Sequence, residues 1–383
     1  MKIALVRARY NPYGGAERFA ARAMSALSAD QDQAAEIAVL ARSWRDVEAD
    51  RGAVRLIRCD PFYVGSVWRD ASFASAVRKR LRDERFDLVQ SHERIVGLPI
   101  YRAGDGVHAA WLERRARAAN ASTRFGIALN PHHRYLVRTE RAMFQHPALN
   151  AVICNSEMVR REIVERFDIA ADKLVLIRNG VDLDRFHPDA SAVHRHVLRQ
   201  RLGLSNDATV FTMVGSGFER KGVCHALRAL PECAGAVLVI VGDDKHRDRY
   251  RSEARRLGVD GRVRFVGSVV DPLPYYAMAD FCLAPTLYDP FPNACLEALA
   301  CGLPLVTTDA CGAAELVDED VNGWIVPSGE HEALAVAMQI AVGTDATRRT
   351  SLRSAARSAA EPWSMAVLAS ALIGLYRSLL AAH

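Results

Sequence analysis

The sequence predicts an α/β protein of two doubly wound parallel-sheet domains that face each other across an interdomain cleft. Short apolar runs alternate with stretches of helical period along nearly the whole chain, which indicates βαβ units and parallel sheets. The alternation stops in a polar stretch over 179–208 and resumes at Thr209. We interpret that stretch as a linker between two such units, and 383 residues are enough for two domains.

Strands are expected wherever apolar and β-branched residues run together without an interrupting charge. In the first half these are Lys2–Val6, Glu36–Leu40, Val54–Ile57, Asp87–Gln90, Gly97–Tyr101, Ala151–Cys154 and Lys173–Ile177, and in the second half Thr209–Val214, Ala236–Val241, Val263–Val266, Asp280–Ala284 and Leu303–Thr307. Amphipathic helices are expected at Ala16–Leu27, Glu157–Phe167 and Val223–Leu230. The expected domains are 1–190 and 191–363, with a C-terminal helix over 364–383 packing back onto the first.

Composition and cysteine spacing exclude several classes of protein. Apolar residues make up 50% of the chain and charged residues 25%, as in ordinary soluble proteins. No uncharged apolar stretch is long enough to span a membrane, and the apolar run at the N-terminus is too short for a signal peptide. The eight cysteines form no CxxC pair, so we expect free, buried thiols in a reducing cytosol.

The charge is unevenly distributed. Residues 1–190 hold 31 Lys and Arg against 24 Asp and Glu, whereas residues 191–383 hold 19 against 21. The segment 107–141 contains seven Arg and two Glu, interleaved with Trp111, Leu112 and Phe125. This mixture suits contact with an anionic membrane or a phosphorylated glycolipid, although a solvated helix pair fits equally well. No nucleic-acid-binding module surrounds the segment, so nucleic acid is not an expected partner.

The strongest local signal is the segment 288–297, which follows the expected strand Asp280–Ala284. Asp289 stands in a Pro-rich loop, and Glu297 stands eight residues later in an otherwise apolar helix. Because ligands of open α/β sheets bind beyond the carboxyl ends of strands, Asp289 is expected beside a ligand, together with the N–H groups of a helix beginning near Phe291. Glu297 needs a hydrogen-bonding partner, which ribose hydroxyls would supply. The alternative is a helix cap and a surface glutamate.

Two glycine-containing loops are candidate anion sites. Gly215 to Gly222 follows the expected strand Thr209–Val214, and its glycines allow close backbone approach while Arg220 and Lys221 would neutralise a diphosphate. It matches neither a Walker loop nor a dinucleotide fingerprint, and solvated cations at a helix end are the alternative. The Gly14-Gly15 turn after the first strand is a weaker candidate, since glycine is common in tight turns.

A further group of polar residues follows strands of the first domain. Asp105 lies between two glycines after the expected strand Gly97–Tyr101, and His108 would transfer a proton near neutral pH. A turn-forming aspartate and a packing histidine are the alternatives. His92 and Glu93 are weaker candidates. We find no DxD-like acidic cluster, so no metal ion is expected.

These segments together resemble the GT-B glycosyltransferases of family 4, over nearly the whole chain. The resemblance is carried by 14–17, 179–188, 220–222 and 289–302, the last of which is similar to the family's E-x7-E motif with Asp289 as the first acid. It implies two Rossmann-like domains, the N-terminal one for the acceptor and the C-terminal one for a nucleotide sugar. The donor is then a substrate, and no other cofactor is expected.

The resemblance also implies roles for single residues. Glu297 would hold the ribose, Asp289 the donor sugar, and Arg220 with Lys221 the diphosphate. Asp105 would occupy the place where many members carry a histidine. The remaining donor contacts that it implies are Gly14, Gly15, Gly215, Val269, Phe291, Pro292 and Asn293.

Within the family, the loops are most similar to those of lipopolysaccharide core glucosyltransferases, whose donor is UDP-glucose. The expected activity is therefore retaining transfer of a hexose to a glycolipid or oligosaccharide, by a cytoplasmic protein on the inner face of the membrane. The alternatives are transfer from GDP-mannose, UDP-GlcNAc or UDP-galactose in polysaccharide assembly, and a sugar-nucleotide epimerase or hydrolase. An oxidoreductase is disfavoured because no GxGxxG follows Leu5-Val6.

Overall fold

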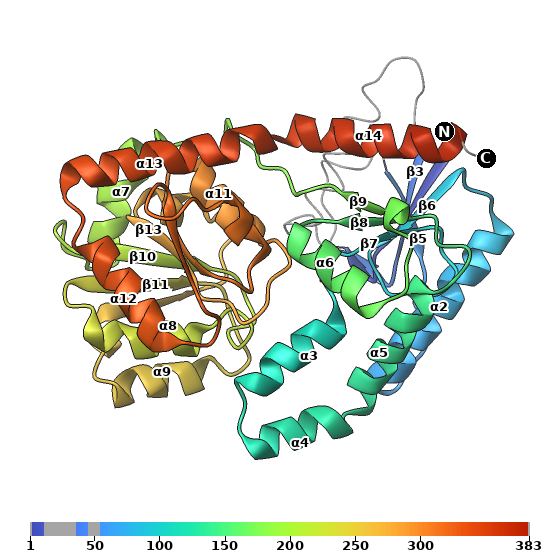
Figure 1. Ribbon diagram of the computed structural model, residues 1–383, viewed down its shortest axis with the longest axis horizontal. Coiled ribbons are helices and arrows are strands. Elements are labelled where there is room, and N and C mark those ends of the chain that lie inside the picture. The colour runs from blue at the N-terminus through green and yellow to red at the C-terminus, as the bar shows by residue number, and fades with distance from the viewer. Residues whose placement is uncertain (1, 11–35, 45–53, 382–383) are drawn as a thin grey trace. The chain divides into compact units, whose positions relative to one another are not determined.

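The chain forms two compact units, each built on its own parallel sheet (Figure 1). The computed structural model describes residues 2–10, 36–44 and 54–381. The first unit is Met1–Gly180 with Met365–His383, and the second is Val181–Ser364. Their division lies before the expected boundary at residue 190, because the segment from Val181 onward packs with the second unit. The backbone N–H of Val181 donates to the carbonyl of Trp363 at 2.9 Å.

The first unit contains a seven-stranded sheet of order β5-β3-β1-β6-β7-β8-β9 in which all pairings are parallel. Its strands are β1 (Lys2–Val6), β3 (Glu36–Ala41), β5 (Val54–Arg58), β6 (Leu88–Ser91), β7 (Ile100–Arg102), β8 (Ala151–Cys154) and β9 (Leu174–Leu176), and β2 (Arg9–Tyr10) pairs separately with β4 (Ser43–Trp44). Each expected strand of this half is present. The expected strand Gly97–Tyr101 begins only at Ile100, because Gly97 has a φ of 89° outside the extended region.

Helices cover both faces of this sheet. They are α2 (Gly65–Asp83), α3 (His108–Arg117), α4 (Ala121–Leu129), α5 (Pro131–Phe144), α6 (Glu157–Arg166) and α14 (Met365–Ala381), with a 3-10 turn at Ala171–Lys173. Alternate residues of β1 and β3 face opposite cores. One core includes Leu368 and Leu372 of α14, and the other includes Phe73 and Val77 of α2. The C-terminal helix therefore completes the first unit, and the expected helix Ala16–Leu27 lies outside the described residues.

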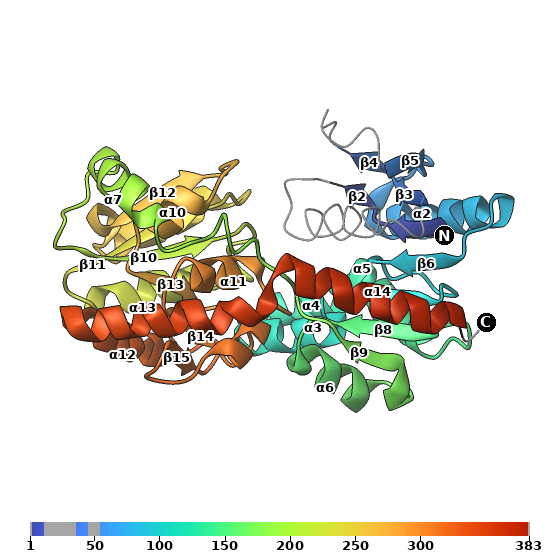
Figure 2. The same cartoon turned by 90° about the horizontal axis from the view of Figure 1, so that it is seen from above.

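The second unit has a six-stranded parallel sheet of order β12-β11-β10-β13-β14-β15. The strands are β10 (Thr209–Val214), β11 (Ala236–Val241), β12 (Val263–Gly267), β13 (Phe281–Ala284), β14 (Leu305–Thr308) and β15 (Gly323–Val326). The helices are α7 (Ala190–Arg201), α8 (Val223–Ala229), α9 (Arg247–Arg256), α10 (Leu273–Ala277), α11 (Asn293–Ala300), α12 (His331–Val342) and α13 (Ala346–Ala360), with 3-10 turns at Leu230–Glu232, Asp260–Arg262, Gly312–Leu316 and Glu361–Trp363. Helix α11 packs along α13 (Figure 2). Strand β15 was not expected.

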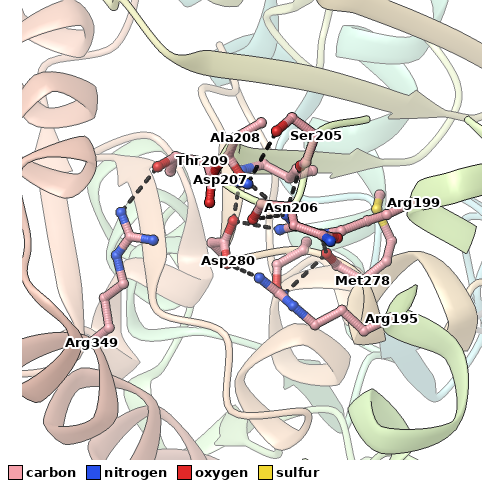
Figure 3. Close-up of polar contacts among 12 residues, drawn as sticks. Arg195, Arg199, Ser205, Asn206, Asp207, Ala208, Thr209, Met278, Asp280 and Arg349 are labelled. Atoms are coloured by element: carbon pink, nitrogen blue, oxygen red, sulfur yellow. Dashed lines mark hydrogen bonds and ion pairs between the residues drawn. The ribbon is translucent and has the colours of Figure 1, made fainter. Parts of the chain in front are cut away.

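The interpretation of 179–208 as a linker throughout is wrong, because the stretch contains the helix α7 (Figure 3). Leu198 of this helix packs in the core of the second unit, and ion pairs anchor the rest of its packed face. Arg199 is 2% exposed and donates to Asp280 Oδ2 at 2.7 Å, while Arg195 donates to Asp280 Oδ1 at 2.6 Å. Burial alone would raise the pKa of Asp280, but the two guanidinium groups hold it below its usual range. Polar residues on the packed face explain why hydrophobic periodicity did not reveal α7.

The eight cysteines are free thiols, as expected, and all except Cys224 are buried. Among the residues that the structure describes, no helix is both long and apolar enough to cross a bilayer.

Candidate donor site

The two strongest sequence signals meet at one edge of the second sheet. The strand order reverses between β10 and β13, which are neighbours in the sheet although two strands separate them in sequence. Such a switch point leaves a crevice at the carboxyl ends of the two strands, where ligands of open α/β sheets bind. The loop after β10 contains Gly215 to Gly222, and the loop after β13 contains Asp289.

Backbone contacts tie these two loops together. The carbonyl of Arg220 accepts hydrogen bonds from the backbone N–H of Leu287 at 2.9 Å and from the hydroxyl of Thr286 at 2.8 Å. Gly222 has a φ of 73°, and a Cβ on it would lie 1.8 Å from the carbonyl oxygen of Pro285. A side chain at position 222 would therefore push the two loops apart, and this explains why a glycine occupies the position.

Asp289 and both cations form one ion-pair cluster. Arg220 Nη1 donates to Asp289 Oδ2 at 2.7 Å, and Lys221 Nζ donates to the same oxygen at 2.8 Å. The Asp289 side chain is 7% exposed, whereas that of Arg220 is 38% exposed. Burial would raise the pKa of Asp289, but Lys221 and Arg220 outweigh it and hold the pKa below its usual range. These three side chains together carry a formal charge of one positive unit, and the Arg220 guanidinium is partly exposed.

A small cavity lies beneath this cluster. Its volume is about 20 Å³, roughly the space of one water molecule. Its lining includes Gly215, Lys221, Ala294 and Cys295. Gly215 has a φ of 140°, and a Cβ there would lie 2.7 Å from Lys221 Cε. The glycine therefore leaves room for the lysine side chain to lie across the end of β10.

Glu297 is positioned by a residue that the sequence did not indicate. Its Oε2 accepts a hydrogen bond of 2.9 Å from the hydroxyl of Tyr276, which is completely buried on α10. Burial and the neighbouring Glu297 both raise the pKa of Tyr276, so this phenol remains a hydrogen-bond donor. Tyr276 lies 21 residues before Glu297 in an apolar stretch, and no spacing motif links the two.

Helix α11 begins at Asn293, later than the expected start near Phe291. Pro292 is the N-cap and Phe291 is 3% exposed within the second unit's core, so its side chain faces away from solvent. The expected donor contact of Phe291 would then come from its backbone alone. Val269 lies in the loop after β12 and packs partly against the same core. Gly14 and Gly15 lie outside the described residues.

The two candidates of the first unit, Asp105 and His108, are close in sequence, but Asp105 is exposed whereas His108 is largely buried. The Asp105 side chain is 57% exposed and lies 3.6 Å from Arg7 Nη1. His108 begins α3, and its Nε2 lies 3.1 Å from Nδ1 of His133. Burial, helped by Arg94 and His133, lowers the pKa of His108 to about 3. A group with so low a pKa is a weak proton acceptor at neutral pH, which argues against the expected catalytic role.

The basic segment 107–141 folds as the helices α3, α4 and α5. Helix α4 buries none of its residues, and the side chains of Phe125 and Leu129 are 67% and 57% exposed. Arg124 lies next to Phe125 in the same helix. An exposed apolar pair beside arginines is typical of helices that lie on membrane surfaces. The described part of the chain contains no group of three or more His, Cys, Asp or Glu side chains placed to hold a metal ion.

Comparison with known proteins identifies relatives of both units. A family model described as Glycosyl transferases group 1 matches residues 208–342, and another described as Glycosyltransferase Family 4 matches residues 13–185. Lipopolysaccharide glucosyltransferase WaaG of Escherichia coli is 27% identical over 85% of this chain and 85% of that protein. D-inositol 3-phosphate glycosyltransferase of Jonesia denitrificans is 28% identical over 76% of this chain and 71% of that protein.

The fold has a close counterpart among solved structures. The crystal structure of WaaG, a glycosyltransferase involved in lipopolysaccharide biosynthesis, matches with a TM-score of 0.82 at 25% identity, covering 96% of this chain and 97% of that one. The expected GT-B architecture of two Rossmann-like domains is therefore confirmed.

Proposed function

Because the chain belongs to the family 4, group 1 glycosyltransferases, we propose that it transfers glucose from UDP-glucose to a glycolipid acceptor of the lipopolysaccharide core type, with retention of anomeric configuration. The observation that carries the donor part is the cluster of Arg220, Lys221 and Asp289 at the switch point of the second sheet. The glucosyl part is supported by the similarity to WaaG, which is named a lipopolysaccharide glucosyltransferase.

The charges of the cluster suit a sugar diphosphate. Without a ligand, Asp289 neutralises one of the two cations. A diphosphate brought to the partly exposed Arg220 would accept charge-assisted hydrogen bonds from its guanidinium. Asp289 would then turn one carboxylate oxygen toward hydroxyls of the sugar. Glu297, oriented by Tyr276, would accept hydrogen bonds from the ribose.

This arrangement supports a mechanism based on positioning and electrostatics. As the bond between sugar and diphosphate breaks, negative charge develops on the leaving oxygen, and Arg220 with Lys221 would stabilise it. The acceptor hydroxyl would attack from the same face, and the departing diphosphate would take its proton. Two fixed cations supply the charge stabilisation that a divalent metal gives in other transferases, so we propose that activity is independent of metal.

The acceptor part of the proposal rests on the surface of α3, α4 and α5. A glycolipid is held in a bilayer, so an enzyme that acts on it gains from lying on the membrane surface. Phe125 and Leu129 would enter the headgroup region while neighbouring arginines contact anionic lipid. We therefore place the protein peripherally on the inner face of the cytoplasmic membrane.

A second candidate function is glycosyl transfer to a phosphorylated inositol. It is favoured by the similarity to D-inositol 3-phosphate glycosyltransferase, which extends over 76% of the chain. The two candidates share the donor half of the reaction and differ in the acceptor, since inositol phosphate is soluble and anionic.

The test begins with thermal unfolding of the protein in a panel of UDP- and GDP-sugars. UDP-glucose is expected to raise the melting temperature most. Proton NMR of the reaction with a truncated core glycolipid should then show a product of retained configuration, with the same rate in the presence of EDTA. A larger shift with another sugar nucleotide would overturn the donor assignment, and loss of transfer in EDTA would overturn metal independence.

A further inference from the structure

The amino edge of the second sheet, opposite the donor cluster, is built around a buried acid. Asp280 precedes β13, and its Oδ2 accepts a hydrogen bond of 2.7 Å from the backbone N–H of Val210 in β10. Two arginines of α7 bind the same carboxylate, Arg195 on Oδ1 at 2.6 Å and Arg199 on Oδ2 at 2.7 Å (Figure 3). Both oxygens are therefore engaged before any further cation approaches.

Helix α13 brings a row of three arginines to this region. Arg349, Arg353 and Arg357 recur every four residues, a spacing that places them along one face of the helix. Arg349, at one end of the row, donates to the hydroxyl of Thr209 at 3.0 Å. Arg357, at the other end, donates to the carbonyl of Ala300 at 2.9 Å. The middle side chain, Arg353, forms no hydrogen bond and no ion pair with any residue that the structure describes.

The surroundings of Arg353 compensate its charge only in part. The residue is half-buried. Burial and the positive charge of Arg195 lower the pKa of Arg353, against an opposing effect of Asp280, whose oxygens are bound elsewhere. A guanidinium has five N–H donors and no acceptor, so holding it partly out of water without an acceptor is costly.

Arg195 is a second cation with donors to spare. Its Nη1 donates to the carbonyls of Met278 at 3.2 Å and Ala279 at 3.0 Å, and its Nη2 donates to Asp280. Its Nε donates to no described residue, and the side chain is 33% exposed. An oxyanion that accepts from Arg195 and Arg353 together would satisfy these donors and offset the repulsion between the two like charges.

We propose that Arg353 and Arg195 bind a free oxyanion of the phosphate class at the amino edge of the second sheet, and that the bound ion stabilises the second unit. Phosphate presents acceptor oxygens that match the planar fork of a guanidinium. Both side chains are only partly exposed, so a small ion reaches them more readily than a phosphate attached to a larger molecule.

The site is separate from the donor site. Strands β10 and β13 begin at this edge, and the loops that follow their opposite ends hold the donor cluster. The inference therefore does not depend on the proposed function.

The experiment titrates inorganic phosphate into the full chain and follows thermal unfolding, with potassium chloride at matched ionic strength as the reference. Phosphate is expected to raise the melting temperature of the wild type above the reference, because it binds the folded chain. In Arg353→Gln the half-saturating phosphate concentration should rise at least about tenfold, since charge-assisted hydrogen bonds are lost. In chloride this variant should melt no lower than the wild type, because Arg353 has no bond within the described chain to lose.

Two further variants separate this site from other cations of the second unit. Arg220→Gln alters the donor cluster, and Arg255→Gln alters an exposed arginine of α9 that forms no ion pair with the described residues. Both should keep the phosphate response of the wild type. A response that Arg353→Gln retains would overturn the proposal, whether or not Arg220→Gln loses it. A wild-type response no larger than that to chloride, or an Arg353→Gln protein that melts below Arg255→Gln in chloride, would also overturn it.

A second titration distinguishes the free ion from a phosphate ester. Glycerol 3-phosphate is expected to raise the melting temperature less than inorganic phosphate at the same concentration, because its carbon chain must enter beside two partly buried side chains. A larger effect of glycerol 3-phosphate would overturn the assignment of the site to the free ion.

Discussion

The carboxyl edges of the two sheets are built on the same topological plan but hold their charges differently. In the second unit, Arg220 and Lys221 donate to one oxygen of a buried Asp289 at 2.7 and 2.8 Å. In the first unit, Arg7 lies 3.7 and 3.6 Å from two acids, and one of them, Asp105, has a side chain that is 57% exposed. At the second edge both cations are within hydrogen-bond distance of their acid, whereas Arg7 Nη1 of the first edge lies beyond that distance from Glu93 Oε1 and from Asp105 Oδ2.

The difference corresponds to the ligands that the family resemblance implies, an acceptor for the first unit and a nucleotide sugar for the second. A nucleotide diphosphate presents the same charged group in every turnover, so a cluster fixed before binding loses little energy in reorganisation. An acceptor sugar presents hydroxyls, whose recognition depends on the arrangement of several weak contacts. The comparison predicts that changes in the second unit have large effects on stability and on the chemical step, while changes in the first unit have smaller effects on acceptor choice.

The largest expected effect is the loss of the buried network around Asp280, at the amino ends of β10 and β13. Asp280→Ala leaves Arg199, 2% exposed, without its carboxylate partner. The expected loss in free energy of unfolding is about 3–5 kcal/mol, as for other broken buried pairs. Urea denaturation measures it. Asp248→Ala, which removes an exposed pair with Arg251, is the control and should cost under about 1 kcal/mol. Equal losses in the two variants would contradict the claim that buried ion pairs hold the second unit in its folded arrangement before a ligand binds.

The next effect concerns the donor cluster. Lys221→Ala removes one of the two cations facing the leaving diphosphate, and kcat should fall about 100- to 1000-fold. The exposed Lys245→Ala, a charge removed elsewhere in the same unit, should leave kcat within about twofold. Steady-state kinetics with UDP-glucose measure both. A Lys221 variant that keeps its kcat and raises only KM would show that the lysine binds donor without stabilising the leaving charge.

The two units should also respond differently to acid. Burial lowers the pKa of His92, of His108 (to about 3) and of His133 in the first unit, and that of His225 in the second, where Asp280 and Asp289 also have lowered pKa values. A histidine with a lowered pKa loses stabilisation as pH falls below about 6.5, and an aspartate with a lowered pKa loses it only below about 4. The first unit has more such histidines and should therefore lose more stability than the second between pH 7 and 5, by about 1–2 kcal/mol after allowance for solvent screening.

Hydrogen exchange followed peptide by peptide distinguishes the units. Protection in β6, β7 and β8 should fall between pH 7 and 5 while that in β10 and β13 changes little, after correction for the intrinsic pH dependence of exchange. Simultaneous loss in both units would contradict the assignment.

The smallest effect is expected at the membrane surface. Replacing both Phe125 and Leu129 by serine removes the exposed apolar side chains of α4 and should weaken binding to anionic vesicles about tenfold. Because α4 buries none of its residues, stability should be unchanged. Val193→Ser, at an exposed position of α7 in the second unit, is the matched control. Sedimentation with phosphatidylglycerol vesicles measures binding. Unchanged binding of the double variant would contradict the proposal that α4 contacts the membrane.

The sequence predicted best the features that depend on contiguous apolar runs. Strands β1, β8, β10 and β11 have the expected bounds because each is a nearly continuous buried run bounded by polar or small residues. Strand β15 was not predicted because it is short and begins at Gly323, a residue with low propensity for strands.

The donor site was predictable as far as its parts are local in sequence. Arg220, Lys221 and Asp289 each follow a strand end, and so a rule about parallel sheets could bring them together. Tyr276 was missed because an aromatic residue in an apolar stretch looks like core, and only the fold brings its hydroxyl to Glu297. The pairing of Asp289 with both cations was also not expected, since the family roles assigned them to different parts of the donor.

The most direct test of the central claim is calorimetric titration of UDP-glucose into the wild-type protein, Glu297→Ala and Tyr276→Phe. The account predicts that the wild type binds, that Glu297→Ala weakens binding at least tenfold by removing a charge-assisted hydrogen bond, and that Tyr276→Phe, which only releases the orientation of Glu297, weakens it less. Wild-type affinity in the Glu297 variant, with the protein folded, would contradict the assignment of this edge as the donor site.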